Sequence, residues 1–262
     1  MKYLPIIYIF IVLIVLNGID VAASRRSLKM QNKIGTLISA PLNALVHFGT
    51  PKFITDKLAI SPILIPDTHL FPNVNVLRNN YNVIKQDALK ALSLSRPIKN
   101  DLFFRNIADS GWKRFYLKWY GPPDEVASKH CSNTVKLLQG MPEVHLGMFS
   151  ILMPGSKISA HHGPARMCLR YHMGIITPND TNCRITIGGE NYAWKDREDV
   201  MFDDTFIHEV VNNTDKVRIV LFLDIERPQY KTFEPLVKAM IHYGGPLTTR
   251  SNEKQEKVID IK

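Results

Sequence analysis

The chain has 262 residues, of which 45% are hydrophobic and 22% are charged, and its formal net charge is +9. This length fits one substantial domain with a well-filled core, preceded by a targeting segment. The basic residues are dispersed, with no interleaved aromatic platform or nucleic-acid reading motif, which indicates a solvated basic surface and no nucleic-acid partner. The three cysteines, Cys131, Cys168 and Cys183, lack the spacing of a zinc finger and do not define a disulfide framework.

The N-terminus combines a basic start with a long apolar run. Lys2 precedes a nearly unbroken apolar stretch from Tyr3 to Ile19, and the small residues Val21-Ala22-Ala23 follow. The run approaches the length of a membrane-spanning helix, whereas the small residues would suit a signal peptidase. We expect residues 1–23 to be a signal anchor that holds the protein in a membrane of the secretory pathway, such as the endoplasmic reticulum. Cleavage as a signal peptide, followed by secretion, is the alternative.

Helical periodicity begins only after a proline-rich segment. Residues 24–73 mix basic residues and short apolar patches, which predicts a linker or packing arm. The prolines that interrupt this segment are Pro41, Pro51, Pro62, Pro66 and Pro72. Between Asn80 and Leu94, apolar residues recur at helical spacing while charged residues occupy the other side, which predicts an amphipathic helix. A shorter helix is expected from Asn133 to Leu138.

The pattern of apolar and turn residues changes after about residue 143. Short apolar runs alternate with turn residues such as Pro154-Gly155 and Gly188-Gly189, and this pattern predicts a β-rich core over residues 143–228. A last helix is expected from Phe233 to Tyr243, followed by a mobile tail over residues 246–262.

Two histidines are candidate metal ligands. His161 and His208 each stand at the edge of a strand-like segment, so two strands could bring both imidazoles to one ion. Imidazole suits iron, zinc and copper. The familiar site with two histidines and one carboxylate is incomplete here, because Gly163 occupies the second position after His161. Taken alone, either histidine would more often be structural.

Two arginines in apolar strands are candidate anion-binding groups. Alternation along residues 167–173 places Cys168, Arg170 and His172 on one face, and Arg218 begins a strongly apolar run. A guanidinium group can grip a carboxylate through two parallel hydrogen bonds. The alternative is an internal salt bridge, for which Asp203, Asp204 and Asp224 are the possible partners.

The stretch from Ser150 through Pro228 resembles the aspartyl/asparaginyl β-hydroxylase family of 2-oxoglutarate and iron(II) dioxygenases. Order and spacing carry the resemblance, since the family likewise places an arginine ten positions after its second histidine. The matching residues are Ser150, Pro154-Gly155, His161, Gly163-Pro164, Leu169-Arg170, His172, Trp194, Phe202-Asp203-Asp204, His208-Glu209, Arg218 and Asp224. Weaker similarity reaches back through Gly111-Trp112-Lys113.

The resemblance implies a mainly β, α+β fold for residues 74–245. Its core would be a double-stranded β-helix (a cupin-like jelly roll) with flanking helices. It implies that His161 and His208 bind iron(II) without a protein carboxylate. Asp204 is then a candidate to orient one imidazole by a hydrogen bond.

The resemblance also implies a binding site for 2-oxoglutarate. Arg218 with Ser150 would receive the distal carboxylate of this cosubstrate. Arg170 and His172 would contact its metal-side carboxylate or the prime substrate, and would complete the catalytic set with the two iron-binding histidines. The implied reaction consumes 2-oxoglutarate and O2, releases succinate and carbon dioxide, and hydroxylates a carbon atom.

Three departures from the family pattern concern the prime substrate. Relatives that act on aspartyl side chains carry an arginine where Cys168 stands, an asparagine where Arg166 stands and a glycine where Arg197 stands. Loss of an arginine opposite an acidic side chain removes a charge-assisted contact of roughly 1.5 to 3 kcal/mol.

We expect a hydroxylase that acts on aspartyl or asparaginyl residues of protein substrates. A hydroxylase of lipid acyl chains from the same family is the nearest alternative, and a jelly-roll binding module without catalysis is another. Zinc-protease chemistry is disfavoured, because His208-Glu209-Val210-Val211-Asn212 carries asparagine where that motif needs its second histidine.

Overall fold

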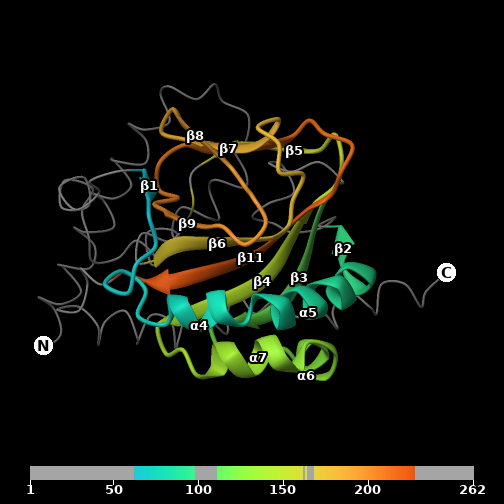
Figure 1. The fold of residues 1–262 in the computed structure, drawn as a ribbon, viewed down its shortest axis with the longest axis vertical. Coiled ribbons are helices and arrows are strands. Elements are labelled where there is room, and N and C mark those ends of the chain that lie inside the picture. Colours follow the sequence, from blue (N-terminus) through green and yellow to red (C-terminus); the bar gives the residue numbers. More distant parts are fainter. Residues whose placement is uncertain (1–61, 98–110, 162, 164–167, 228–262) are drawn as a thin grey trace, which may run out of the picture.

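The computed structural model describes residues 62–97, 111–161, 163 and 168–227, which form two facing antiparallel sheets with helices on one side (Figure 1). The larger sheet has seven strands in the order β1-β9-β6-β11-β4-β3-β2, and the smaller has four in the order β5-β10-β7-β8. The larger sheet comprises β1 (Ile63–Leu64), β2 (Arg96–Pro97), β3 (Trp112–Trp119), β4 (Val144–Leu152), β6 (Cys168–Ile176), β9 (Asp199–Phe202) and β11 (Arg218–Glu226). The smaller comprises β5 (Lys157–His161), β7 (Cys183–Ile187), β8 (Glu190–Ala193) and β10 (His208–Asn212).

The strands from β4 to β11 follow the course of a jelly roll. Strands β4, β6, β9 and β11 lie in the larger sheet, β5, β7, β8 and β10 lie in the smaller, and every pairing is antiparallel. Eight antiparallel strands arranged as two packed sheets define this architecture. The expected double-stranded β-helix within a mainly β, α+β fold is therefore confirmed.

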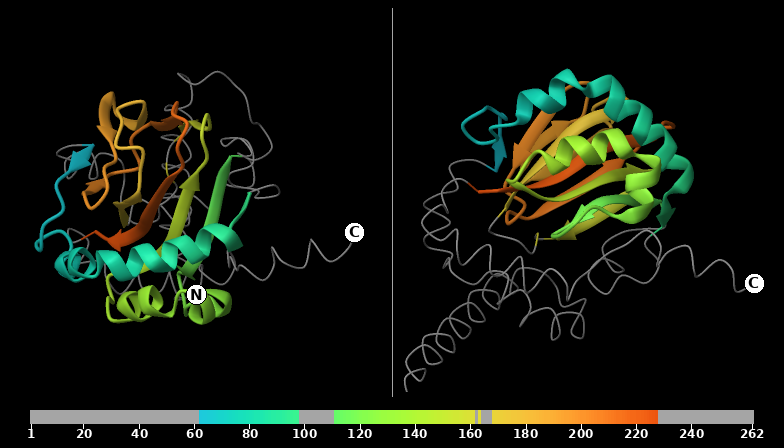
Figure 2. Two further views of the ribbon diagram at one scale, coloured as in Figure 1. Left: turned by 45° about the vertical axis from the view of Figure 1, so that its right-hand side comes forward. Right: turned by 90° about the horizontal axis from the view of Figure 1, so that it is seen from below.

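Helices cover the outer face of the larger sheet, away from the smaller one (Figure 2). They are α4 (Val74–Asn79), α5 (Tyr81–Leu94), α6 (Glu125–His130) and α7 (Ser132–Gln139). Helix α5 confirms the amphipathic helix predicted from Asn80 to Leu94, and α7 confirms the shorter one. The buried carboxylate of Asp87 joins them, because it accepts hydrogen bonds from the backbone N–H and the hydroxyl of Thr134, both at 2.9 Å.

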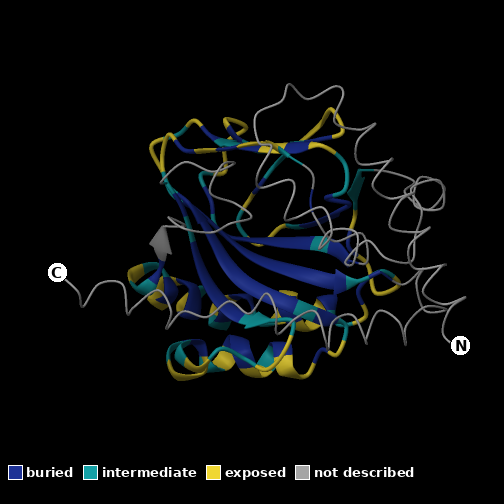
Figure 3. Ribbon diagram, turned by 180° about the vertical axis from the view of Figure 1, so that it is seen from behind, coloured by how far each residue is buried: buried dark blue, intermediate teal, exposed yellow. Residues whose placement is uncertain are grey.

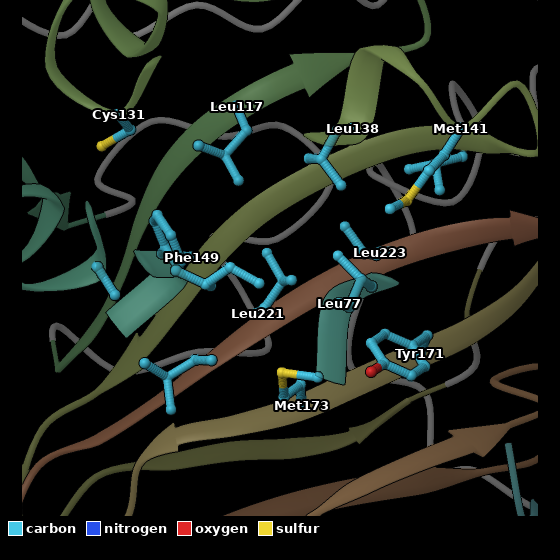
Figure 4. Packing of buried hydrophobic residues seen from close by; sticks show 14 of the residues in the cluster. Leu77, Leu117, Cys131, Leu138, Met141, Phe149, Tyr171, Met173, Leu221 and Leu223 are labelled. Carbon is cyan, nitrogen blue, oxygen red and sulfur yellow. The ribbon is translucent and has the colours of Figure 1, made fainter. Parts of the chain in front are cut away.

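The main hydrophobic core fills the space between these helices and the larger sheet (Figure 4). Along β11, Ile219, Leu221 and Leu223 face this core, where they pack with residues such as Leu77 and Tyr171. Because strand side chains alternate, the intervening residues of β11 point between the two sheets. The central strands are thus buried on both faces (Figure 3).

A second apolar cluster lies between the sheets. It includes Trp112, Trp194, Phe202, Val220 and Phe222. This inter-sheet space also holds most of the candidate site residues, since they alternate with the residues of the main core.

The larger sheet extends beyond the predicted β core of residues 143–228. Strand β3 lies outside that span and pairs with β4 along most of its length. Part of the predicted linker or packing arm is also ordered, because β1 pairs with β9 and Phe71 is fully buried in the main core.

Several expectations concern residues outside those described. They are the N-terminal segment 1–23, the last helix from Phe233 to Tyr243 and the tail over residues 246–262. Within the described part of the chain, no helix is long and apolar enough to cross a membrane.

Candidate metal and dicarboxylate site

His161 and His208 face each other across two neighbouring strands. They are direct partners in the antiparallel register of β5 and β10, and their ring centroids are 4.2 Å apart. Each ring donates its Nδ1–H to the carbonyl oxygen two residues earlier, Ser159 at 2.7 Å and Phe206 at 2.9 Å. A carbonyl can only accept, so these bonds fix the tautomer and put the lone pair on Nε2, as a metal ligand requires.

Gly163 cannot be exchanged for a carboxylate without displacing a neighbour. A Cβ atom at this position would lie 1.7 Å from Oδ2 of Asp204, and the Gly163 N–H donates to the Asp204 carbonyl at 2.7 Å. Asp204 therefore fills the space where a third ligand would begin. Among the residues that the structure describes, no cluster of three or more His, Cys, Asp or Glu side chains could hold a metal.

Arg218 is a buried cation that lacks an acidic partner among the described residues. The residue is 1% exposed, one guanidinium nitrogen lies 3.4 Å from the Ser150 hydroxyl, and Nε has no hydrogen-bond partner within the described part of the chain. The guanidinium carbon stands 4.7 Å from the centre of the Trp194 ring. Burial lowers the pKa of Arg218 to about 10. Because burying an unpaired charge is costly, the arrangement fits a bound anion.

His172 lies near both Arg218 and His208, whose charges act on its imidazole. Its ring centroid is 4.8 Å from that of Phe202 and 5.8 Å from that of Trp194, and neither ring nitrogen has a hydrogen-bond partner among the residues that the structure describes. Burial, reinforced by the charges of Arg218 and Arg170, lowers the pKa of His172 well below its ordinary value. The ring is therefore neutral at physiological pH and offers both a donor and an acceptor to a ligand.

Arg170 forms an internal salt bridge, which was one of the two alternatives that the sequence offered for it. Its guanidinium contacts the carboxylate of Asp204 and lies 3.1 Å from that of Asp224. Burial raises the pKa of both carboxyl groups, and the positive charge of Arg170 opposes that shift. The prediction that Asp204 orients an imidazole is wrong. The carboxylate of Asp204 pairs with Arg170, and the carbonyl oxygen of Phe206 accepts the hydrogen bond that orients the His208 ring.

Two further residues reach the site without a role assigned from sequence. The Tyr120 hydroxyl donates to Asp224 at 2.5 Å, and the Trp112 Nε1–H donates to the Ser150 hydroxyl at 3.0 Å. Trp112 belongs to the weaker stretch of family similarity, so there was some reason in the sequence to expect it near the site. No sequence signal pointed to Tyr120, since its position depends on a left-handed backbone conformation with φ of 45°.

The histidine pair, the buried guanidinium and the unpaired imidazole therefore share the space between the two sheets. Nitrogen ligands of this kind suit iron(II), and a diacid would supply the acceptors that Arg218 and His172 lack. The residues present fit a metal and a dicarboxylate bound next to each other.

Comparisons with known proteins identify the family and several relatives of the chain. The family model described as Aspartyl/Asparaginyl beta-hydroxylase matches residues 78–228. The ornithine lipid ester-linked acyl 2-hydroxylase of Rhizobium tropici is 34% identical over 182 residues, which are 66% of this chain and 63% of that protein. The aspartyl/asparaginyl beta-hydroxylase of Homo sapiens is 29% identical over 165 residues, which are 60% of this chain and 21% of that protein.

Among solved structures, an oxidoreductase of the 2OG-Fe(II) oxygenase family from Burkholderia pseudomallei is 14% identical with a TM-score of 0.41. The match covers 54% of this chain and 76% of that one. The chain spans less than two thirds of the length of either relative named above, 63% of the bacterial protein and 21% of the human one. Since the family model spans more than half of its residues, the chain belongs to the aspartyl/asparaginyl β-hydroxylase family.

Proposed function

We propose that this protein is an iron(II)- and 2-oxoglutarate-dependent dioxygenase that hydroxylates a carbon atom of its substrate. The observation that carries the proposal is the buried guanidinium of Arg218, which lacks an acidic partner in the described structure and shares the inter-sheet space with two imidazoles of fixed tautomer. A dicarboxylate beside a metal ion satisfies both features.

His161 and His208 would hold the iron through Nε2, since Nδ1 of each ring is engaged by a backbone carbonyl. Bound iron supplies the activation of O2 that amino-acid side chains cannot provide. The protein's part is to bind, to orient and to exclude water. The Ser159 carbonyl lies on β5 and the Phe206 carbonyl lies in the bend before β10, and their hydrogen bonds hold the two rings in the orientation that a metal requires.

Arg218 and Ser150 would receive the distal carboxylate of 2-oxoglutarate. The Ser150 hydroxyl accepts from Trp112 and lies near Arg218, so its own proton remains to be donated to a carboxylate oxygen. His172, neutral and unpaired, would bind a second oxygen group of the cosubstrate or of the prime substrate. The apolar rings around it exclude water from the reacting groups.

For the prime substrate, aspartyl or asparaginyl side chains in proteins are the first candidate, because that is the reaction for which the family is named. Arg170 supports a second candidate, a lipid acyl chain. Its charge is already compensated by Asp204 and Asp224, so it does not offer an unpaired cation to an acidic side chain. Cys168 on the same face of β6 is buried and uncharged, since burial raises its pKa well above the ordinary value.

The test is to incubate the full chain with iron(II), 2-oxoglutarate and O2, together with either aspartyl- and asparaginyl-containing peptides or acyl lipids. We expect succinate formation that depends on the substrate, and one added oxygen atom in the product by mass spectrometry. No succinate from metal-loaded protein with either class would refute the proposed activity and favour a binding module.

A further inference from the structure

Trp194 carries a buried hydrogen-bond donor that nothing in the described structure satisfies. The residue directly follows β8 and is 1% exposed, and its Nε1–H has no hydrogen-bond partner in residues 62–97, 111–161, 163 and 168–227. Buried N–H groups in native proteins are nearly always paired, because an unmade hydrogen bond in the interior is costly. The unpaired indole therefore points to a ligand.

Arg218 and His172 lie beside this indole. The guanidinium carbon of Arg218 is 4.7 Å from the ring centre of Trp194, and the ring centroid of His172 is 5.8 Å away. Both neighbours also have buried nitrogens that lack a hydrogen-bond partner among the described residues. A single ligand rich in oxygen atoms would satisfy all three residues at once.

The turn after Trp194 is held against β6 by hydrogen bonds. Arg197 donates its N–H to the Gly174 carbonyl at 3.0 Å, and Thr177 donates its N–H to the Asp196 carboxylate at 2.7 Å. A Cβ at Gly174 would lie 2.1 Å from the carbonyl oxygen of Lys195, so this close approach requires glycine. The indole is thus held in place by backbone contacts and forms a preorganised donor.

We propose that Trp194 is a further cosubstrate-binding residue. Its Nε1–H donates a hydrogen bond to the carboxylate that Arg218 receives, while its ring face holds the guanidinium in position. This inference rests on the proposed function, since the ligand is the distal carboxylate of 2-oxoglutarate. A carboxylate accepts about four hydrogen bonds, enough for donors from Arg218, Ser150 and Trp194 together.

The test compares ligand affinities of the iron(II)-loaded full chain without O2, measured by calorimetry. The probes are 2-oxoglutarate and glutarate, which has both carboxylates but lacks the oxo group. Trp194→Phe keeps an aromatic face for Arg218 and removes the donor. We expect it to bind each probe about tenfold more weakly, the effect of one hydrogen bond to a charged acceptor. Trp119→Phe, the same exchange at the end of β3, should leave both affinities unchanged.

Equal affinity in wild type and Trp194→Phe would overturn the inference, as would an equal loss in Trp119→Phe. A loss for 2-oxoglutarate but not for glutarate would place the contact at the oxo end and contradict the assignment to the distal carboxylate. Failure of the wild type to bind 2-oxoglutarate is a different result, because it would refute the proposed function itself.

A second measurement needs no substitution at the site. The chain has three tryptophans, so its indole N–H signals can be resolved by nuclear magnetic resonance with diamagnetic Zn(II) in place of iron. Addition of glutarate should move the Trp194 indole proton downfield, as a new hydrogen bond does, and leave that of Trp119 in place. An unmoved Trp194 signal at saturating glutarate would overturn the inference even if the phenylalanine variant did not fold.

Discussion

Replacing Arg218 with methionine should separate ligand binding from stability. Burial lowers the pKa of Arg218 well below its ordinary value, to about 10. Since a change of one in pKa corresponds to about 1.36 kcal/mol, a shift of this size means that holding the cation in the folded protein costs on the order of 3 kcal/mol. Since the group is protonated in both the folded and the unfolded chain at neutral pH, the whole cost is present there. This cost is relieved only as the pH rises from about 10 towards the ordinary pKa of arginine, because the folded protein then releases the proton before the unfolded chain does.

Two contacts of Arg218 offset part of this cost. The hydrogen bond with Ser150 contributes about 1 kcal/mol and the stacking on Trp194 about 1 kcal/mol. Arg218→Met should therefore raise the free energy of unfolding of the ligand-free protein by about 1 kcal/mol. Affinity for 2-oxoglutarate should fall by at least about 30-fold, because truncating one partner of a buried charge pair costs about 2 kcal/mol or more.

The assays are denaturant unfolding of the metal-free protein and calorimetric titration of the iron(II)-loaded protein. Arg184→Met is the matched control, since Arg184 lies half-buried on β7 and its hydrogen bond to the Thr181 carbonyl is 3.4 Å long. It should change stability by no more than about 0.5 kcal/mol and leave affinity unchanged. A loss of more than about 2 kcal/mol in Arg218→Met, the effect of truncating an ordinary core residue, would refute the reasoning.

Three further predictions concern the metal ligands and their surroundings. His161→Ala and His208→Ala should each reduce bound iron from one ion per chain to a trace by elemental analysis while the fold is retained; stoichiometric iron in either variant would reject that residue as a ligand. Gly163→Ala should lower the free energy of unfolding by about 1 to 3 kcal/mol, because its Cβ would lie 1.7 Å from the Asp204 carboxylate. Combining it with Asp204→Ala should cost less than the sum of the two changes in denaturant unfolding, and strict additivity would contradict that contact. Asp224→Asn should cost about 1 to 3 kcal/mol in the same assay, because it weakens a buried ion pair 3.1 Å long; an unchanged unfolding midpoint would show that the pair is not formed in solution.

The jelly roll and its main helix were predictable because their signals are local or depend on residue order. Periodicity between Asn80 and Leu94 predicted α5, and the order of the family's residues predicted the two sheets. Strand β3 was not predicted, since charged residues interrupt its apolar pattern. One of them, Arg114, is buried and stacks 3.8 Å from the centre of the Trp112 ring, an arrangement that alternation alone cannot reveal.

Pairing among the charged residues of the site could not be predicted from sequence. Arg170 and Arg218 looked alike as arginines in apolar strands, yet Arg170 contacts two carboxylates and Arg218 contacts none among the described residues. The difference arises from tertiary neighbours, because Asp224 is the cross-strand partner of Arg170 in the register of β6 and β11. The spacing of residues in the sequence does not predict how β6 and β11 align with each other.

Asn212 shows the same limit for a short motif. The sequence Asn212-Asn213-Thr214 reads as a glycosylation acceptor, but the side chain of Asn212 is fully buried. Its amide nitrogen donates to the carbonyl oxygens of Leu152, Met153 and Lys216. In the folded protein this asparagine is a structural link between loops and is not accessible to a transferase.

The most direct measurement is a crystal structure of the full chain with manganese(II) and N-oxalylglycine, an analogue of 2-oxoglutarate. We predict one metal ion bound by Nε2 of His161 and Nε2 of His208, with the distal carboxylate of the analogue held by Arg218 and Ser150. A metal bound elsewhere, or an analogue whose distal carboxylate lies away from Arg218, would contradict the account.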